Sequence, residues 1–292
     1  MGVDAEERAG FREEGPASEY RHPVLDMHVH PPFPHAYTPE GLSYAMTVNP
    51  QGVSLFEELR EPADFLAYFH GLGVDHVVLL AEEAPLVSGM VMSEDVVDFA
   101  TGTDGLHAFV SFNPHLTLDP LGRFEALRER GRVAGVKFLP SYQHFWPNDR
   151  RLYSLYGRLE ELRLPVTFHT GLSRFRGTKL KYAQPVLLDE VAVDFPDLPI
   201  LLAHAGRGVW YGEALLLASL HEHVYLEISG LPPRNLPTYF PRLESVLDKV
   251  VFGSDFPGVP SIPDNLRDLR EVLGPEAAHR VLWCNGARLL GL

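Results

Sequence analysis

The segment Val24-Leu-Asp-Met-His-Val-His30 is the first of eight short apolar runs in a chain of 292 residues. The other runs lie at 76–81, 106–113, 133–139, 165–169, 199–204, 224–229 and 250–254. After a longer first gap, consecutive runs begin roughly 25 to 35 residues apart, which leaves room for one crossover helix each. The runs are nearly continuous in apolar residues, as in parallel strands that helices cover. Eight such units predict an α/β fold of the (β/α)₈ TIM-barrel type, with an open doubly wound sheet as the main alternative.

The domain organisation follows from the same runs. With 45% hydrophobic residues the chain can bury a full core. Residues 1–22 are expected to form a polar N-terminal extension, and residues 23–292 a single barrel domain. The long first gap, residues 31–59, is rich in proline and aromatic residues. We expect it to be a lid-like loop over the catalytic face, since loops of this length are uncommon unless they have such a role.

Charge and composition exclude several classes of partner. The chain has 25 Lys and Arg residues against 39 Asp and Glu residues, a formal net charge of −14. Such a charge repels phosphate backbones and anionic lipids, so we expect neither nucleic acid nor membrane as a partner. No apolar run reaches the roughly 18 residues of a membrane span, and residues 1–20 lack the apolar core of a secretory signal. These features predict a cytoplasmic protein, and they leave open whether it forms a homo-oligomer.

Two histidines in the first run carry the first chemical signal. Residues two apart in a strand point to the same face, so Asp26, His28 and His30 share one side. Two imidazoles at the end of a buried strand are costly unless something binds them. A metal ion can do so, because each neutral imidazole offers a nitrogen lone pair. If these histidines stood alone, a half-exposed polar strand would be the better explanation, because two histidines at this spacing occur by chance in many chains.

Three further polar residues stand at the ends of later runs. His169 ends the fifth run, His204 ends the sixth and Asp255 follows the eighth. The C-terminal ends of barrel strands converge on one mouth, so these side chains are expected to meet the histidines of the first run. Imidazole and carboxylate groups together are ligands suited to zinc or a similar divalent ion. The joint pattern therefore predicts a metal site.

The same motifs resemble those of the amidohydrolase superfamily. They are Asp-x-His-x-His at 26–30, His-Thr-Gly at 169–171, His-Ala-Gly at 204–206 and Gly-Ser-Asp-Phe-Pro at 253–257. The C-terminal residues 284–292 also resemble the closing helix of the amidohydrolase-related family, in the branch of aminocarboxymuconate-semialdehyde decarboxylase and γ-resorcylate decarboxylase. The resemblance covers about residues 23–292. It implies a metal-dependent (β/α)₈ barrel.

The resemblance also implies roles for the site residues. His28, His30, His169 and Asp255 would bind one divalent metal ion, most often Zn²⁺, with Mn²⁺ as an alternative. His204 would be a metal ligand or a substrate-facing acid/base. In hydrolytic members the metal activates a water molecule, and the aspartate at the place of Asp255 takes its proton and passes it to the leaving group. In decarboxylating members the same site binds a substrate carboxylate and protonates the adjacent carbon.

Lys137 lies inside the apolar run 133–139, where a lysine is costly unless its amine finds a partner. It is therefore a candidate for contact with the metal or the substrate. Some superfamily members carry a carbamylated lysine on this strand that bridges two metals. The branch resembled here usually has an unmodified lysine. We therefore favour one metal ion over a second metal held by carbamylated Lys137.

Two loops provide candidates for substrate binding. Residues 172–184 contain four basic residues and no acidic residue. Arg174 or Arg176 could bind a substrate carboxylate by paired hydrogen bonds, although a solvated loop would have the same composition. Tyr142, His144 and Trp146 follow the fourth run and could form an aromatic pocket, or could simply pack against helices. Glu82, Asn113 and Ser229 also fall near strand ends and could line the mouth.

Taken together, these features predict a metal-dependent hydrolase. Metal-activated water would attack an amide, ester or lactone in a small, carboxylate-bearing or cyclic substrate that is expected to be anionic. The first alternative is a metal-dependent decarboxylase, a lyase that acts on an aromatic or unsaturated acid. The second is a barrel that binds metal and a small ligand without turnover. The intact set of histidines and Asp255 argues against this last interpretation.

Overall fold

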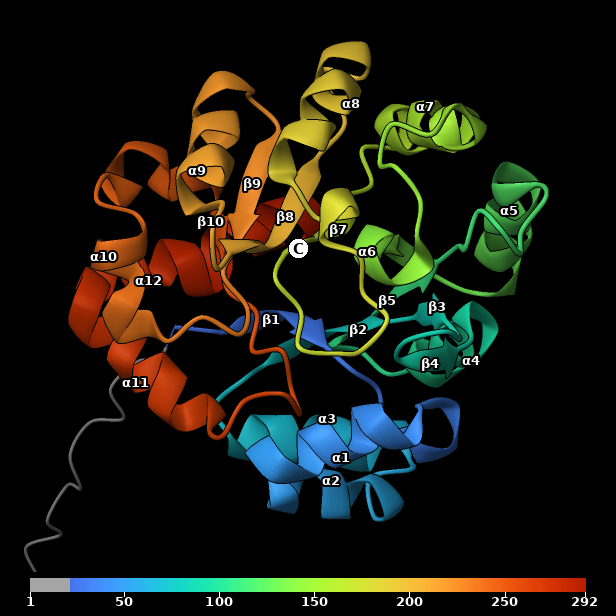
Figure 1. Ribbon diagram of the computed structural model, residues 1–292. Helices are drawn as coiled ribbons and strands as arrows, with labels where there is room; N and C mark the ends of the chain where they lie inside the picture. Colours follow the sequence, from blue (N-terminus) through green and yellow to red (C-terminus); the bar gives the residue numbers. More distant parts are fainter. Residues whose placement is uncertain (1–21) are drawn as a thin grey trace, which may run out of the picture.

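The computed structural model describes residues 22–292, so the expected polar extension lies outside the described residues except for His22. Eight strands form one sheet in the order β1-β2-β5-β6-β7-β8-β9-β10, and all neighbouring strands are parallel (Figure 1). Their bounds are β1 (Leu25–Val29), β2 (His76–Leu80), β5 (Leu106–Ser111), β6 (Val133–Phe138), β7 (Val166–Gly171), β8 (Ile200–Arg207), β9 (Val224–Glu227) and β10 (Val250–Val251).

The sheet closes between β1 and the segment that follows β10. Three backbone hydrogen bonds join these two segments: Met27 N to Phe252 O at 3.0 Å, Asp255 N to His28 O at 2.9 Å and His30 N to Phe256 O at 2.9 Å. An open sheet would leave these groups at two separate edges. The (β/α)₈ barrel predicted from the sequence is therefore confirmed.

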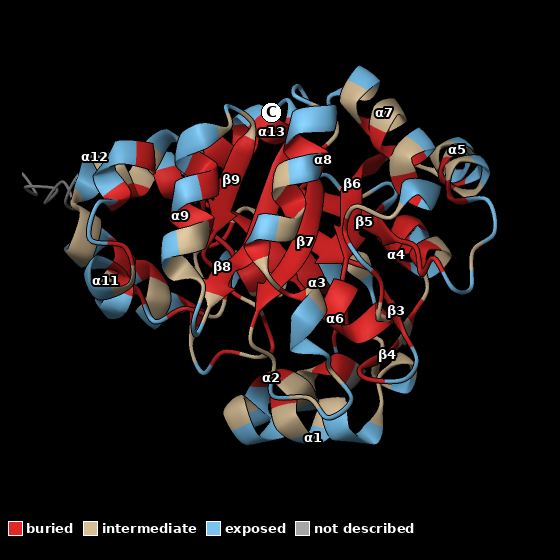
Figure 2. Ribbon diagram, turned by 45° about the horizontal axis from the view of Figure 1, so that its top comes forward, coloured by how far each residue is buried: buried red, intermediate tan, exposed pale blue. Residues whose placement is uncertain are grey.

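Helices surround this sheet, whose strands are almost entirely buried (Figure 2). The main ones are α3 (Pro62–Gly71), α4 (Ser93–Ala100), α5 (Pro120–Arg130), α7 (Tyr153–Leu162), α8 (Asp189–Asp194), α9 (Tyr211–Leu220), α11 (Ile262–Leu273), α12 (Pro275–His279) and α13 (Asn285–Leu290). Two single-turn helices, α6 (Pro140–Gln143) and α10 (Leu236–Tyr239), follow β6 and β9. Within residues 22–292, no helix combines the length and the apolar character that crossing a bilayer requires.

Residues 31–59 are largely helical, which corrects the expectation of a loop. They form η1 (Pro34–Ala36), α1 (Pro39–Val48), α2 (Pro50–Ser54) and η2 (Leu55–Glu57). Pro39 and Pro50 each begin a helix, a position where the missing N–H costs nothing. The side chains of Thr38 and Asn49 cap these two helices. The prolines that suggested a loop are therefore helix-start signals.

A short hairpin, β3 (Glu82–Ala84) and β4 (Gly89–Val91), holds this helical segment in place. Thr38 N donates to Ser88 O at 2.8 Å, and Thr38 Oγ1 donates to Val87 O at 3.1 Å. Gly89 has a φ of 143°, and a Cβ at this position would collide with the carbonyl of Ala36. Glycine is thus required where the hairpin meets the segment before α1.

The C-terminal helix α13 is attached to the last strand through Asn285. This side chain is buried, and its Nδ2 donates to Val250 O at 2.7 Å and to Leu247 O at 2.9 Å. Both carbonyls belong to the short segment that leads into and forms the start of β10. Since β10 contributes only two residues to the sheet, Asn285 supplies part of the hydrogen bonding that fixes this edge.

We predict that Asn285→Ala destabilises the fold by about 1–3 kcal/mol, because it leaves carbonyl groups without a donor. Urea denaturation measures the change in the free energy of unfolding. The matched control is Asn235→Ala, since Asn235 is exposed and its side chain makes one hydrogen bond within residues 22–292, from Nδ2 to Tyr239 Oη at 3.1 Å. The control should change stability by less than about 0.5 kcal/mol. Equal losses in both variants would contradict the role given to Asn285.

Candidate active site

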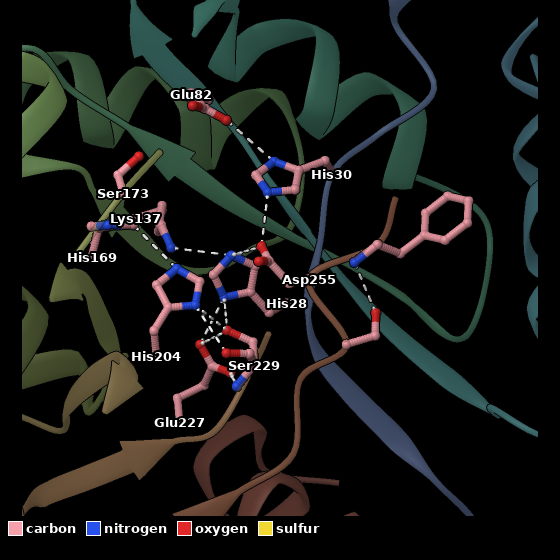
Figure 3. A network of polar contacts seen from close by, with 12 residues as sticks. His28, His30, Glu82, Lys137, His169, Ser173, His204, Glu227, Ser229 and Asp255 are labelled. Carbon is pink, nitrogen blue, oxygen red and sulfur yellow. Dashed lines mark hydrogen bonds and ion pairs between the residues drawn. The ribbon is translucent and has the colours of Figure 1, made fainter. Parts of the chain in front are cut away.

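The predicted metal ligands, together with His204 and Lys137, meet at the C-terminal ends of the strands (Figure 3). His28 and Lys137 lie on β1 and β6, and His169 and His204 lie on β7 and β8. His30 follows β1 directly, and Asp255 lies in the segment after β10 that closes the barrel. Residues separated by more than 200 positions in the chain are thus brought together, as expected for a barrel mouth.

His28, His30 and Asp255 form a group that could hold a metal ion. One ligand atom from each lies within 4.8 Å of the others, and no second group of this kind occurs among the residues described. Asp255 Oδ1 lies 3.4 Å from Nε2 of His28 and 3.4 Å from Nε2 of His30. The hydrogen bond from Asp255 N to His28 O fixes this arrangement through the backbone.

The tautomer of His28 is set by Glu227 on β9. His28 Nδ1 donates to Glu227 Oε2 at 2.7 Å, and Ser229 Oγ donates to the same oxygen at 2.9 Å. Burial holds the pKa of His28 well below its usual range, so the ring is neutral and Nε2 carries a lone pair. This lone pair faces the carboxylate of Asp255. Two acceptors at this distance repel each other unless a cation lies between them, which is the chemistry of a metal site.

The tautomers of His204 and His169 follow from a single carbonyl group. His204 Nδ1 lies 3.0 Å from Ser229 O, and a carbonyl can only accept, so Nδ1 donates. His204 Nε2 then accepts from His169 Nδ1 at 3.1 Å, because burial keeps the pKa of both rings low and both are neutral. His169 Nε2 is left with a lone pair. This atom is buried and has no hydrogen-bond partner within residues 22–292.

His169 is therefore prepared to bind a cation, although it is not a member of the group of three. Neutral imidazoles whose second nitrogen donates to a fixed acceptor are typical metal ligands. His28 and His169 both have this form. The residues present thus fit a divalent metal ion.

His30 lies between two carboxylates. Its Nδ1 is 3.2 Å from Glu82 Oε2, and its Nε2 is 3.4 Å from Asp255 Oδ1. Burial lowers the pKa of His30, but Asp255 and Glu82 outweigh it and raise this pKa to about 9. A divalent cation can replace the proton at Nε2. The other oxygen of Glu82 accepts from Ser88 in the β3–β4 hairpin, so His30 is connected to the structure that holds α1.

Lys137 is buried beside His28. Its Nζ lies 3.4 Å from His28 Nε2, the atom that faces Asp255. Burial lowers the pKa of Lys137, and Glu227, Asp255 and Glu82 oppose this shift. The lysine expected to contact the metal or the substrate thus lies at the group of three ligands.

The backbone is strained at three of the predicted site residues, two of them beside the ligand group and the third, His144, farther along the chain after β6. His204, its neighbour Ala205 and Asp255 have φ values of 61°, 44° and 71°, in the left-handed region that residues other than glycine rarely adopt. Each such conformation costs about 1–3 kcal/mol and persists where surrounding contacts fix it. Strain of this kind is concentrated at functional sites.

A cavity of about 770 Å³ opens above these residues, within the range of small-molecule sites. Its aromatic walls come from the helical segment 31–59, from the helices α6, α9 and α10, and from the loop after β7: Tyr37, Tyr44, Phe56, Tyr142, Phe175, Tyr211 and Tyr239. The rings of Tyr211 and Tyr239 stack with their centroids 4.4 Å apart. The cavity therefore combines a polar floor with apolar, aromatic sides.

The residues predicted to bind substrate are divided by this cavity. Tyr142 and Arg174 line it, and the Tyr142 ring lies 4.8 Å from the ring of His169. The other three do not line it: His144 Nε2 donates to Gly177 O at 2.7 Å, Trp146 packs against Tyr182, and Arg176 is exposed. His144 is itself in the left-handed region, with a φ of 58°, and it ends α6. The chain turns away from the barrel mouth there.

Two charged residues of the site were not identified from the sequence. Glu227 is the only charged residue of the run 224–229, and Arg207 directly follows the His-Ala-Gly motif at 204–206. Both belong to strands, β9 and β8. A charged side chain at the end of a buried strand was the available signal, since such a group needs a partner. Glu82 and Ser229, considered only as residues of the mouth, contact the ligand histidines directly.

Comparison with known proteins identifies the family and supports the fold. A family model described as amidohydrolase matches residues 25–292. No curated protein matches the chain. An uncharacterized TIM-barrel protein from Bordetella bronchiseptica has a similar structure, with a TM-score of 0.76 and 21% identity over 92% of this chain and 98% of that one.

Two other solved structures share the barrel at lower identity. A probable 2-pyrone-4,6-dicarboxylic acid hydrolase from Acinetobacter baumannii has a TM-score of 0.61 and 15% identity, and covers 92% of this chain and 99% of its own. The 5-carboxyvanillate decarboxylase from Sphingomonas paucimobilis has a TM-score of 0.60 and 14% identity, with coverages of 93% and 100%. At such identities these structures show the common fold alone. The family match, together with the ligand group at the barrel mouth, shows that the chain belongs to the amidohydrolase family.

Proposed function

We propose that this protein is a metal-dependent hydrolase that cleaves an amide, ester or lactone in a small, carboxylate-bearing or cyclic substrate. The observation that carries the proposal is the set of fixed acceptors at the barrel mouth. His28 Nε2 and Asp255 Oδ1 face each other without a proton between them, and His169 Nε2 has no partner within the described residues. These atoms lie on residues that line a cavity of substrate size.

In this proposal His28, His30, His169 and Asp255 hold one divalent metal ion. Imidazole nitrogens and a carboxylate oxygen are ligands that Zn²⁺ prefers, with Mn²⁺ as the alternative. When bound, the ion lowers the pKa of a water molecule to about 7 and polarises the scissile carbonyl. Lys137 lies at this same group of ligands. We favour one ion over a second ion held by a carbamylated lysine because the branch that the motifs resemble usually has an unmodified lysine here.

Asp255 has the position of the proton acceptor. Burial raises its pKa, but the hydrogen bond and charge of His30 and the charge of Arg207 lower it to about 2, so the carboxylate is ionised. Its Oδ1 faces the two histidines, while Oδ2 lies toward Arg207. We assign to Asp255 the removal of a proton from the attacking water and its transfer to the leaving group.

His204 has a different part in the proposal. Both of its ring nitrogens are engaged, Nδ1 with Ser229 O and Nε2 with His169 Nδ1. We therefore assign to His204 the orientation of His169, in preference to acid/base chemistry on the substrate. A substrate that displaced His169 from Nε2 of His204 would free this nitrogen for acid/base chemistry.

A decarboxylase that acts on an aromatic or unsaturated acid is the second candidate. It is favoured by two cationic side chains, Lys137 and Arg207, which lie beside the ligand group where a substrate carboxylate would be held. The proposal also retains from the sequence a small anionic substrate and a cytoplasmic location.

We predict that Glu227→Gln weakens Zn²⁺ binding by about 10- to 100-fold, because the carboxylate that orients His28 is lost. Competition with a chromophoric chelator measures the affinity. Glu222→Gln is the matched control, since Glu222 is exposed on the loop before β9. The control should bind Zn²⁺ like the unchanged protein. A Glu227→Gln variant with undiminished affinity would contradict the orientation proposed for His28.

We also predict zinc-dependent turnover. A panel of lactones, esters, amides and aromatic acids is assayed for both hydrolysis and CO₂ release, and we expect zinc-dependent hydrolysis that a chelator abolishes. Asp255→Asn should lower kcat by about 10²- to 10⁴-fold, as expected when a general base is removed.

Asp197→Asn is the control for this loss, because Asp197 is largely exposed and precedes β8, whereas the ligand group lies at the C-terminal ends of the strands. It should retain full turnover. CO₂ release without hydrolysis would contradict the proposed hydrolase and support the decarboxylase. Undiminished activity of Asp255→Asn would refute the role of Asp255 in either reaction.

A further inference from the structure

Arg207 is a rigidly held cation at the cavity wall. It is the last residue of β8, and its Nε and Nη2 both donate to Leu172 O, at 3.1 and 3.0 Å. The backbone joins the same two residues, since Leu172 N donates to Arg207 O at 2.8 Å. Two hydrogen bonds to one carbonyl fix the plane of the guanidinium, so little side-chain entropy remains to be lost when a ligand binds.

The third nitrogen of Arg207 has no hydrogen-bond acceptor among the described residues. Nη1 donates no hydrogen bond to any of residues 22–292, and its nearest charged partner is Asp255 Oδ2 at 3.7 Å. Arg207 lines the cavity and its side chain is 27% exposed, so Nη1 is accessible to a small molecule. A guanidinium edge in this state is a strong donor for an anion.

The backbone of Gly230 leaves room beside this nitrogen. Gly230 has a φ of 63°, and a Cβ there would lie 2.8 Å from Arg207 Nη1 and 2.8 Å from Asp255 Oδ2. Any other residue would therefore press on both charged groups. Gly230 and Arg207 line the same cavity as Asp255. The space between the guanidinium and the ligand group is thus kept clear by the chain itself.

The arginines of the loop after β7 are less well placed for the same task. Arg174 lines the cavity but is exposed, and no contact within the described residues orients its guanidinium. Arg176 is exposed and does not line the cavity. An exposed arginine loses side-chain entropy and is screened by water when it binds an anion, so it contributes less than a fixed and partly desolvated one.

We propose that Arg207 binds the carboxylate of the substrate through Nη1, and so selects organic acids over neutral compounds of the same shape. This inference rests on the proposed function and adds the residue that recognises the substrate. The ring or chain of such an acid would lie against the walls that include Tyr211 and Tyr239. Asp255 opposes an anion at this place, and Arg207 together with Lys137 and the metal ion provides the positive charge that outweighs it.

The test compares two ligands of nearly the same shape, the anionic 2-naphthoate and the neutral 2-naphthamide. Isothermal titration calorimetry measures their binding to the full chain, both loaded with Zn²⁺ and free of metal. The unchanged protein should bind the carboxylate more tightly than the amide. Arg207→Gln should weaken 2-naphthoate by about 10- to 100-fold, the value of a hydrogen bond between charged groups. The affinity for 2-naphthamide should stay within about twofold of its original value. The neutral amide forms no ion pair with Arg207, so removal of the positive charge affects it little.

Three variants support the comparison. Arg207→Lys keeps the positive charge but loses the pair of hydrogen bonds that fix the guanidinium on Leu172 O. It should therefore retain part of the preference for the carboxylate. Arg176→Gln removes the same charge outside the cavity and should change neither ligand. Arg174→Gln tests the alternative anchor and should have a smaller effect than Arg207→Gln.

Several results would overturn the proposal. These are an unchanged protein without preference for the carboxylate, an equal loss of both ligands in Arg207→Gln, and a larger loss in Arg174→Gln. The ratio of the two affinities is measured within one variant, so partial unfolding does not imitate the expected result. Zinc content is determined separately for every variant. A protein that binds no zinc but shows the Arg207 effect in the metal-free titration would refute the proposed hydrolase and leave the carboxylate site standing.

Discussion

The seam between β1 and the segment after β10 is the contact on which the site depends. Asp26 is buried at this seam, and its Oδ1 accepts from His28 N at 3.1 Å and from Ser254 N at 2.8 Å. It therefore joins the strand that carries the two histidines to the residue before Asp255. Burial raises the pKa of Asp26 to about 7. Keeping this carboxyl group inside the fold is therefore unfavourable by itself, and the contacts around it must offset that cost. Without the seam, the ligands would lie at opposite edges of an open sheet.

Other side chains and backbone groups of the site orient the ligand residues that the seam brings together. Glu227 and the carbonyl of Ser229 each fix one histidine tautomer, so that lone pairs remain at His28 and His169. Arg207 is held by the loop after β7 and faces the second oxygen of Asp255. These contacts come from β8, from β9 and the residues just after it, and from the loop after β7. The chemistry proposed for Asp255 therefore depends on neighbours that orient it from two directions.

The barrel and its principal metal ligands could be predicted from the sequence, because both follow from periodic features. Strands recur at nearly regular intervals, and a polar residue at the end of a buried strand is conspicuous, as with His169 or Asp255. Loops have no such period. His144 adopts a left-handed conformation at the end of α6, and this local turn, which no pattern of residue types indicated, takes it out of the main cavity. The helices of residues 31–59 were hidden for a related reason, since a proline that begins a helix resembles one that breaks it. Glu227 and Arg207 were overlooked because their partners come from other strands.

Anomalous diffraction at the zinc edge, from crystals of the protein loaded with Zn²⁺, tests the central claim most directly. The account predicts a single strong peak at the barrel mouth, bound by His28, His30, His169 and Asp255, with Glu227 still in contact with the far nitrogen of His28. A zinc ion bound elsewhere, or a second ion bridged to the first through Lys137, would contradict it.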